Sequence, residues 1–210
     1  MNHIYIFFLD AYQNTPTSFI ALEAIAFVFG IASVWYAKKE NILVYPTGLV
    51  ATIITVYLLY KAQYFGDMMM NIYYTIMSIY GWWNWSRMKN NKVVVPISTT
   101  TIKEKILGII LVILTMLVTY EVYKYFGNEI KTENYLDIFT SGVFFTAMWY
   151  MANKKIENWA LWILADLITV PLYAYRGLGI LSLQYLIFTI LAIQGYLAWN
   201  KTLHKKTSIL

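Results

Sequence analysis

Long apolar stretches recur along the whole chain, and they restrict its fold more than any other feature of the sequence. Each is about 18 to 20 residues long, the length at which a helix crosses the hydrocarbon core of a bilayer. Only 13% of the residues are charged, about half the share typical of soluble domains. The sequence therefore predicts an all-α integral membrane protein. Its seven predicted transmembrane helices cover residues 19–37, 42–60, 67–86, 106–123, 135–152, 158–175 and 180–199.

Three segments fall outside these spans. Residues 1–18 hold only a short apolar run and no basic region before it, so we expect an interfacial segment rather than a cleaved signal peptide. Residues 87–105 contain Pro96, a Ser/Thr run and five basic residues, which indicates a cytoplasmic linker. Residues 200–210 are predicted to form a cytoplasmic tail.

The basic residues predict the orientation of the spans. With the N-terminus outside, twelve of the sixteen Lys and Arg residues lie on the cytoplasmic side, and only Lys61, Lys124, Lys131 and Arg176 lie outside. Because cytoplasmic loops of membrane proteins are enriched in Lys and Arg, an outside N-terminus and a cytoplasmic C-terminus are expected. The net charge of +5 is thus a signal of topology and not of nucleic-acid binding.

Tryptophan and tyrosine residues gather near the predicted span ends. Such aromatic residues favour the headgroup region of a bilayer, so most of them are interpreted as interfacial anchors. They occur as "WY" at 35–36, "WWNW" at 82–85, "WY" at 149–150 and as Trp199.

The chain also carries an internal duplication. A shift of 114 residues aligns "LEAIAFVFGIASVWY" (22–36) with "LDIFTSGVFFTAMWY" (136–150), and residues 71–85 with 185–199. Three spans reverse the direction of a chain, so a single linking helix is needed to make two such units parallel. The predicted organisation is 3+1+3 with parallel repeats: repeat 1 at 19–86, a linking helix at 106–123 and repeat 2 at 135–199.

Repeats of this kind are typical of secondary transporters, whose substrate sites lie near the bilayer midplane where the repeats meet. A duplicated membrane scaffold without transport activity is the alternative.

An aspartate in the middle of an apolar span is the strongest candidate for a binding residue. Asp166 has no Lys or Arg within one helical turn, and Asn158, Trp162 and Tyr173 share its helical face. An ionised group at this depth should meet a wet cavity or a counter-charge. A cationic ligand, a proton or a sodium ion fits, and neighbouring aromatic rings favour a cationic aromatic ligand. The alternative is a carboxylate that only joins helices.

The third predicted span offers a second polar and aromatic face, made of Asn71, Tyr74 or Thr75, Ser78 and Trp82. Repeat symmetry places residues of the seventh span opposite this face: Tyr185, Phe188, Ala192 and Tyr196. Asn71 and Gln184 are candidates for hydrogen bonds to hydroxyl or amide groups of a ligand. Such residues also commonly join membrane helices to each other, and the sequence leaves both readings open.

Catalytic and metal chemistry find little support in the sequence. The chain has no cysteine, and its two histidines, His3 and His204, lie near opposite termini. We therefore expect no thiolate chemistry, no metal site, no cofactor and no enzyme activity.

Several motifs together resemble a known family. "FGDMMMNIYYTIMSIYGWWNW", "ENWALWILADLITVPLYAYRGL" and "LQYLIFTILAIQGYLAWNK" are similar to segments of the bacterial PnuC-like vitamin transporters, whose best-known members take up nicotinamide riboside. The resemblance implies a 3+1+3 fold related to the SWEET sugar transporters, in the bacterial inner membrane. It also implies Asn158, Trp162 and Asp166 as binding residues and makes a homotrimer plausible.

The resemblance further implies facilitated diffusion of an unphosphorylated vitamin that a cytoplasmic kinase then traps. Members of the family differ in substrate. Nicotinamide riboside and thiamine both carry a permanent positive charge on an aromatic ring, which suits an aspartate among aromatic residues, whereas riboflavin is neutral. Nicotinamide riboside is the favoured substrate, thiamine is the alternative, and a membrane receptor or scaffold without flux is a more distant one.

Overall fold

The chain forms seven helices in a computed structural model that describes residues 15–62, 65–89, 92–126 and 130–207. Most of the predicted N-terminal segment, residues 1–18, lies outside this part of the chain. The helices match the seven predicted spans to within a few residues, except at the end of the last one. They are α2 (Thr17–Lys38), α3 (Val44–Lys61), α4 (Phe65–Ser86), α5 (Ile102–Phe126), α6 (Thr132–Ala152), α7 (Glu157–Tyr175) and α8 (Gly179–Thr207).

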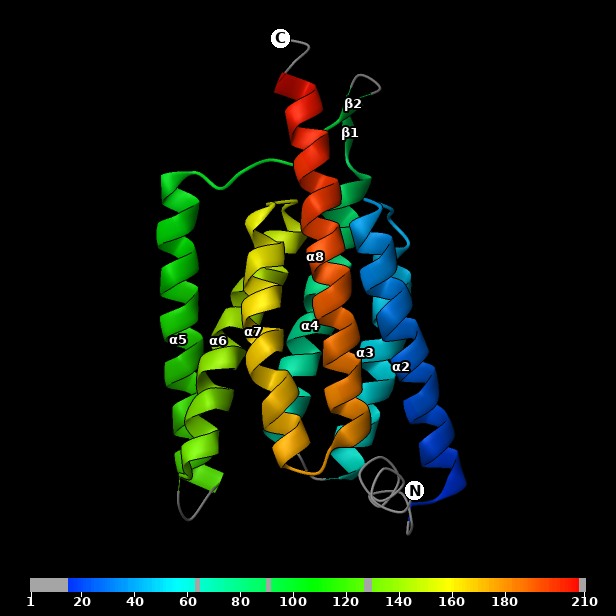
Figure 1. The fold of residues 1–210 in the computed structure, drawn as a ribbon, viewed down its shortest axis with the longest axis vertical. Coiled ribbons are helices and arrows are strands. Elements are labelled where there is room, and N and C mark those ends of the chain that lie inside the picture. The colour runs from blue at the N-terminus through cyan, green and yellow to red at the C-terminus, as the bar shows by residue number, and fades with distance from the viewer. Residues whose placement is uncertain (1–14, 63–64, 90–91, 127–129, 208–210) are drawn as a thin grey trace.

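Six of the helices close a ring, and the seventh packs on its outside (Figure 1). Around the ring, the order of contacting neighbours is α2, α3, α4, α6, α7, α8 and back to α2. Helix α5 packs mainly against α6. We call the end of the bundle that carries residues 92–101 and the last turn of α8 the linker end, and the opposite end the far end.

The helices differ in how apolar they are. Four of them, α2, α3, α5 and α8, are long and apolar enough to cross a membrane, as judged on the described residues. Helices α6 and α7 carry many of the buried residues, including the buried polar residues Thr140, Thr146, Asn158, Asp166 and Thr169. These inward-facing polar side chains lower the mean hydropathy of α6 and α7, which explains why the two helices are less apolar than the other four.

The predicted linker contains more structure than expected. Met88–Lys89 (β1) and Lys92–Val93 (β2) form a short antiparallel ladder, and α5 begins at Ile102, inside the predicted 87–105 segment. At the other end of the chain, α8 continues to Thr207 through most of the predicted tail. Hydropathy marks only the part of a helix that lies in lipid, so it does not register polar helical turns beyond the membrane.

Residues 97–101, which we call the strap, lie across the linker end. The Ser98 amide donates to the Lys154 carbonyl at 3.1 Å. The Glu157 carboxylate accepts two hydrogen bonds of 2.8 Å, one from the Thr100 amide and one from its hydroxyl. The strap is therefore fixed to the turn between α6 and α7.

Helices α2 and α6 end in the same kind of turn. Glu40 and Lys154 adopt left-handed backbone angles, with φ of 54° and 50°. In each turn, an amide bonds back to the carbonyl five residues earlier, Asn41 to Tyr36 and Lys155 to Tyr150. This pattern is the Schellman motif, which glycine usually completes. Here a glutamate and a lysine occupy the left-handed position.

Two tryptophans at the linker end are buried rather than interfacial. Trp85 and Trp199 are 5% and 1% exposed. The Trp85 indole donates to the Met151 carbonyl at 3.3 Å, and the Trp199 indole donates to the Ala37 carbonyl at 3.1 Å. For these two residues the interpretation as headgroup anchors is wrong, because the indole nitrogen finds its partner at the end of a neighbouring helix.

Trp35, Trp82 and Trp83 are 41%, 42% and 57% exposed, which suits a place at the headgroups.

Two glycines allow close ring packing next to these tryptophans. A β-carbon at Gly81 would collide with the ring of Tyr45, and one at Gly195 would collide with the indole of Trp159. The two rings meet Trp85 and Trp199 respectively, each edge to face at an interplanar angle of 86°. Tyr45, Trp85, Trp159 and Trp199 therefore form one packed group, which we call the aromatic plug.

Candidate functional site

Asp166 lies in the middle of α7 and is 1% exposed. Neither of its carboxylate oxygens has a hydrogen-bond partner in the part of the chain that the structure describes. Such a group is costly, because an ionised carboxylate out of water needs a counter-charge or several donors. Among the described residues, no Lys or Arg side chain forms an ion pair with Asp166.

Aromatic rings from three other helices gather around this level of α7. Trp162, one turn before Asp166, lies 5.4 Å from Phe144 of α6 and 6.4 Å from Tyr74 of α4, measured between ring centroids. Phe144 in turn lies 5.9 Å from Tyr185 of α8. Ala165, the residue before Asp166, packs in the same cluster as these four rings. We call Trp162, Phe144, Tyr74 and Tyr185 the central rings.

The aromatic group continues toward the far end. Tyr173, two turns along α7 from Asp166, meets Tyr185 edge to face at 5.3 Å. Phe188 lies 5.9 Å from the same ring. Two predicted site residues, Tyr173 and Phe188, are therefore connected to the central rings through Tyr185.

The carboxylate of Asp166 and the central rings together favour a cationic ligand. A carboxylate attracts a cation, and the faces of aromatic rings attract it as well. An aromatic cation would satisfy Asp166 electrostatically and could stack against the central rings. The described residues contain no group of three or more His, Asp or Glu side chains suited to a metal ion.

Asn158 lies apart from Asp166, in the first turn of α7 at the linker end. It is 0% exposed, and its amide nitrogen donates to the Lys155 carbonyl. Its Oδ1 atom has no partner among the described residues, and the same holds for the Tyr45 hydroxyl and the Trp159 indole nitrogen. Asn158 thus lies at the level of the aromatic plug. It is two helical turns from Asp166, the carboxylate with which it was predicted to share a binding site.

The polar residues predicted on α4 do not gather around Asp166. The Asn71 side chain donates to the Asp67 carbonyl of its own helix at 3.0 Å. Ser78 is buried and lies against Gly48 of α3, and Trp82 is 42% exposed. Of the four residues predicted on this face, Tyr74 is the one with a ring contact to Trp162 among the described residues.

Gln184 of α8 faces α2. A β-carbon placed on Gly30 of α2 would lie 3.3 Å from the amide nitrogen of Gln184 and 3.5 Å from the ring of Phe188. Gln184 therefore packs at the contact between α8 and α2, on one side of the central rings.

Phe144 is the main residue of this group that the sequence reasoning missed. It occurs in the apolar run "GVFFTA", where a phenylalanine carries no signal beyond hydrophobicity. The phase of α6 turns it toward Trp162, and Phe145 stacks instead on Tyr73 at 3.6 Å.

A second carboxylate, Asp137 of α6, has a different environment at the far end. Arg176 donates to both of its oxygens, at 3.2 and 2.6 Å, and the Tyr123 hydroxyl donates at 2.9 Å. We call Asp137, Arg176 and Tyr123 the far-end group. Its contacts join α5, α6 and the end of α7, so Asp137 holds helices together at the far end.

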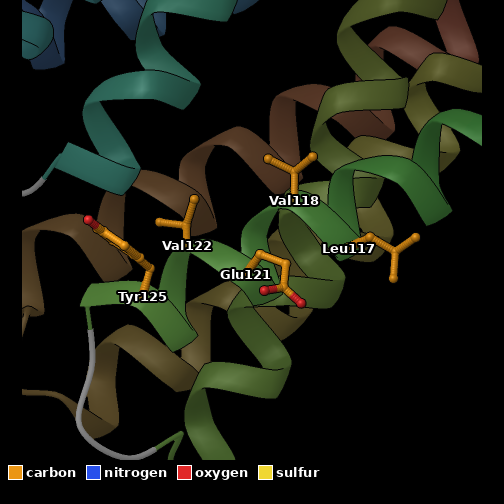
Figure 2. A pocket seen from close by; sticks show the side chains of 5 residues that line it. All are labelled: Leu117, Val118, Glu121, Val122 and Tyr125. Atoms are coloured by element: carbon orange, nitrogen blue, oxygen red, sulfur yellow. The ribbon is translucent and has the colours of Figure 1, made fainter.

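The pocket drawn in Figure 2 lies elsewhere, on the outer helix α5. Its lining is almost entirely apolar, and all of it comes from that one helix: Leu117, Val118, Glu121, Val122 and Tyr125. A hollow on one apolar helix offers no convergent polar groups to fix the orientation of a ligand. It is therefore not the candidate binding site.

A bundle of long helices around a buried carboxylate that has no hydrogen-bond partner among the described residues suits a membrane transporter. Residues 20–201 match the family described as "Nicotinamide mononucleotide transporter". The chain belongs to that family, and the resemblance inferred from the sequence motifs is confirmed.

Relatives and a solved structure agree with this assignment. The nicotinamide riboside transporter PnuC of Escherichia coli is 22% identical, with 89% of this chain and 88% of that protein covered. The protein of the same name from Neisseria mucosa is 28% identical, with 89% and 73% covered. A crystal structure of "the Vitamin B3 transporter PnuC" superposes with a TM-score of 0.68 at 25% identity, covering 88% of this chain and 82% of that one.

Proposed function

We propose that this chain transports nicotinamide riboside across the bacterial inner membrane, with Asp166 opposite the positively charged pyridinium ring. The observation that carries the proposal is the buried Asp166 carboxylate, which has no hydrogen-bond partner in the part of the chain that the structure describes. The aromatic residues around it suit a flat cationic ring. The names of the relatives from Escherichia coli and Neisseria mucosa support the same substrate.

The charge of the site favours the riboside over the mononucleotide. The two differ by a phosphate, which needs Arg or Lys donors to leave water. Asp166 is the charged residue at the level of the central rings, and the far-end guanidinium of Arg176 is engaged by Asp137. A phosphate beside an unneutralised carboxylate would be repelled.

Thiamine is the second candidate, because its ring also carries a permanent positive charge. The same residues would attract it, so the choice between the two cations depends on the polar contacts around the ring. Beyond Asp166 and the central rings, the proposed substrate contacts are Asn71, Ser78, Trp82, Gln184, Phe188, Tyr173 and Asn158.

The fold is proposed to consist of two parallel three-helix repeats joined by α5, in a 3+1+3 arrangement related to that of the SWEET transporters. Trp85 and Trp199 are 114 residues apart, and so are their hydrogen-bond acceptors, Ala37 and Met151. Each tryptophan thus donates to the other repeat, and exchanging the two repeats turns one hydrogen bond into the other. This exchange supports a two-fold relation between the repeats.

The close ring packings support the same relation. Tyr45 and Trp159 are 114 residues apart, as are Gly81 and Gly195, against which their rings pack. The ring of helix contacts is also symmetric under this exchange, because α4 contacts α6 in the way that α8 contacts α2.

All seven helices are proposed to span the membrane, with the linker end in the cytoplasm and the N-terminus outside. The distribution of Lys and Arg supports this orientation. Transport would follow alternating access, in which the two repeats rock about the central rings. No cofactor and no enzyme activity are part of the proposal. A cytoplasmic kinase would trap the product by phosphorylation, and assembly as a homotrimer is part of the proposal.

Flux into proteoliposomes tests this function directly. Purified protein should give saturable uptake of labelled nicotinamide riboside, and the Asp166→Asn variant should lose most of it. Glu121→Gln, which replaces an exposed carboxylate on α5, should transport normally. Tight binding without flux would indicate a receptor or scaffold, and saturable uptake of thiamine alone would indicate the second candidate.

A further inference from the structure

An ion pair joins the two turns at the linker end. The Lys154 ammonium lies 2.7 Å from the Glu40 carboxylate, and the two side chains are 5% and 34% exposed. Lys154 belongs to the turn between α6 and α7, and Glu40 belongs to the turn between α2 and α3. Because the ammonium is almost fully buried, it depends on this one carboxylate for its counter-charge.

The two partners occupy the same position in the proposed repeats. They are 114 residues apart, and each has the left-handed backbone of a Schellman turn. A residue and its own repeat equivalent can contact each other only near the two-fold axis. The pair therefore marks the point where that axis leaves the linker end.

The aromatic plug lies directly next to this pair. The Lys154 ammonium is 4.5 Å from the centre of the Trp85 ring. Trp85 in turn lies 6.0 Å from Trp199, the equivalent residue of the other proposed repeat. The ion pair and the plug together close the bundle at its axis.

Only one of the two turns is held by further ion pairs and by the strap, as far as the described residues show. Lys155 pairs with Glu104 of α5 at 2.8 Å, and Glu157 accepts two hydrogen bonds from Thr100 of the strap. The α6–α7 turn is thereby fixed to α5. The α2–α3 turn contacts it through Glu40, so a separation of the two turns must break the Glu40–Lys154 pair.

We propose that the Glu40–Lys154 pair is a latch that keeps the linker end closed, and that repeat 1 swings away from repeat 2 and α5 when this end opens. The inference rests on the proposed alternating access. Closure buries the ammonium against its carboxylate, whereas opening gives both groups to water. The pair is therefore an interaction that distinguishes the two states, as a conformational equilibrium requires.

Thiol labelling tests the latch without any substrate. The chain has no cysteine, so Thr189→Cys gives a single reporter. Thr189 is 4% exposed and lies ten residues before Trp199 on α8, about 15 Å deeper along the helix. A membrane-impermeant maleimide is added to inverted and to right-side-out membrane vesicles carrying the reporter variant.

Adding Glu40→Gln to the reporter should increase the labelling rate at least about tenfold, because the buried ammonium loses its counter-charge in the closed state. The increase should occur in one vesicle orientation only, the inverted one if the linker end is cytoplasmic. Equal labelling with and without Glu40→Gln, or an increase in both orientations, would overturn the latch.

Two further variants separate the latch from a general loss of packing. Glu104→Gln removes an ion pair at the same end, between α5 and the α6–α7 turn, and should leave the labelling rate within about twofold of the reporter. The charge exchange Glu40→Lys with Lys154→Glu should restore slow labelling, because the ammonium introduced on the α2–α3 turn would meet Trp199 as Lys154 meets Trp85. Fast labelling in either variant contradicts the proposal.

The labelling experiment tests the latch separately from the identity of the transported molecule. If labelling behaves as expected and nicotinamide riboside is not taken up, the latch stands and the substrate is wrong. If uptake is normal and labelling is unaffected by Glu40→Gln, the function stands and the latch is wrong.

Discussion

Two carboxylates of the same half of the molecule have opposite environments. Asp137, in the far-end group, receives hydrogen bonds from Arg176 and Tyr123 on both of its oxygens. Asp166, at the central rings, is more deeply buried and receives none in the described chain. A buried carboxylate with protein partners joins the elements that supply them. A buried carboxylate without such partners lowers the stability of the fold, and groups of this kind cluster at functional sites. The difference supports the proposal that Asp166 binds the ligand, whereas Asp137 joins helices.

The largest effect is expected at Asp166. Asp166→Asn should lower the affinity for nicotinamide riboside about 100-fold, because the charged ring loses its counter-charge at a buried position. The unfolding temperature of the substrate-free protein should stay unchanged or rise, because an unpartnered carboxylate is removed. Calorimetric titration and thermal unfolding measure the two quantities. A variant that unfolds early and binds normally would reverse the assignment.

Asp137→Asn should give the opposite result. The Arg176 guanidinium would lose its ionic partner, and we expect the unfolding temperature to fall by roughly 4–8 °C. The affinity for nicotinamide riboside should change less than about threefold, since the far-end group does not touch the central rings. The same two measurements apply. A selective loss of affinity would show that the far-end group belongs to the site.

The helices and the buried aspartate of α7 could be predicted from the sequence, and the details of the site could not. About twenty consecutive apolar residues must form a helix in lipid, and an aspartate among them is conspicuous. Trp82 and Trp85, by contrast, differ only in helical phase, which decides that Trp85 is buried while Trp82 is exposed. Phe144 has no distinguishing feature until α6 turns it toward Trp162.

The strap and the Glu40–Lys154 pair could not be read either. Both depend on contacts between residues far apart in the chain, and the Ser98–Lys154 and Glu40–Lys154 contacts lie at turns. Charged residues at turns usually remain in water, so their composition alone predicts nothing more specific.

A smaller effect is expected at Trp162. Trp162→Leu should weaken the binding of nicotinamide riboside about tenfold, because a leucine keeps much of the apolar volume but loses the attraction of the ring face for a cation. Trp83→Leu is the matched control, since Trp83 is 57% exposed and remote from the central rings. Equal losses of affinity in the two variants would argue against a cation–π contact at Trp162.

The smallest effect is expected at Thr52, the residue 114 positions before Asp166. Its hydroxyl accepts a hydrogen bond of 2.9 Å from Thr75, so this position of repeat 1 is satisfied within the protein. Thr52→Val should change the affinity for nicotinamide riboside less than about threefold, the value of one weak hydrogen bond between membrane helices. Equilibrium binding measures this effect, and a loss as large as that of Asp166→Asn would mean that both repeats bind the ligand alike.

The most direct test of the central claim compares nicotinamide riboside with its reduced form, which has nearly the same shape and no positive charge on the ring. Wild-type protein should bind the charged form about 100-fold more tightly, and Asp166→Asn should bind the two forms with similar affinity. A preference for the charged form that survives in Asp166→Asn would show that another group recognises the cation, and the account given for Asp166 would be wrong.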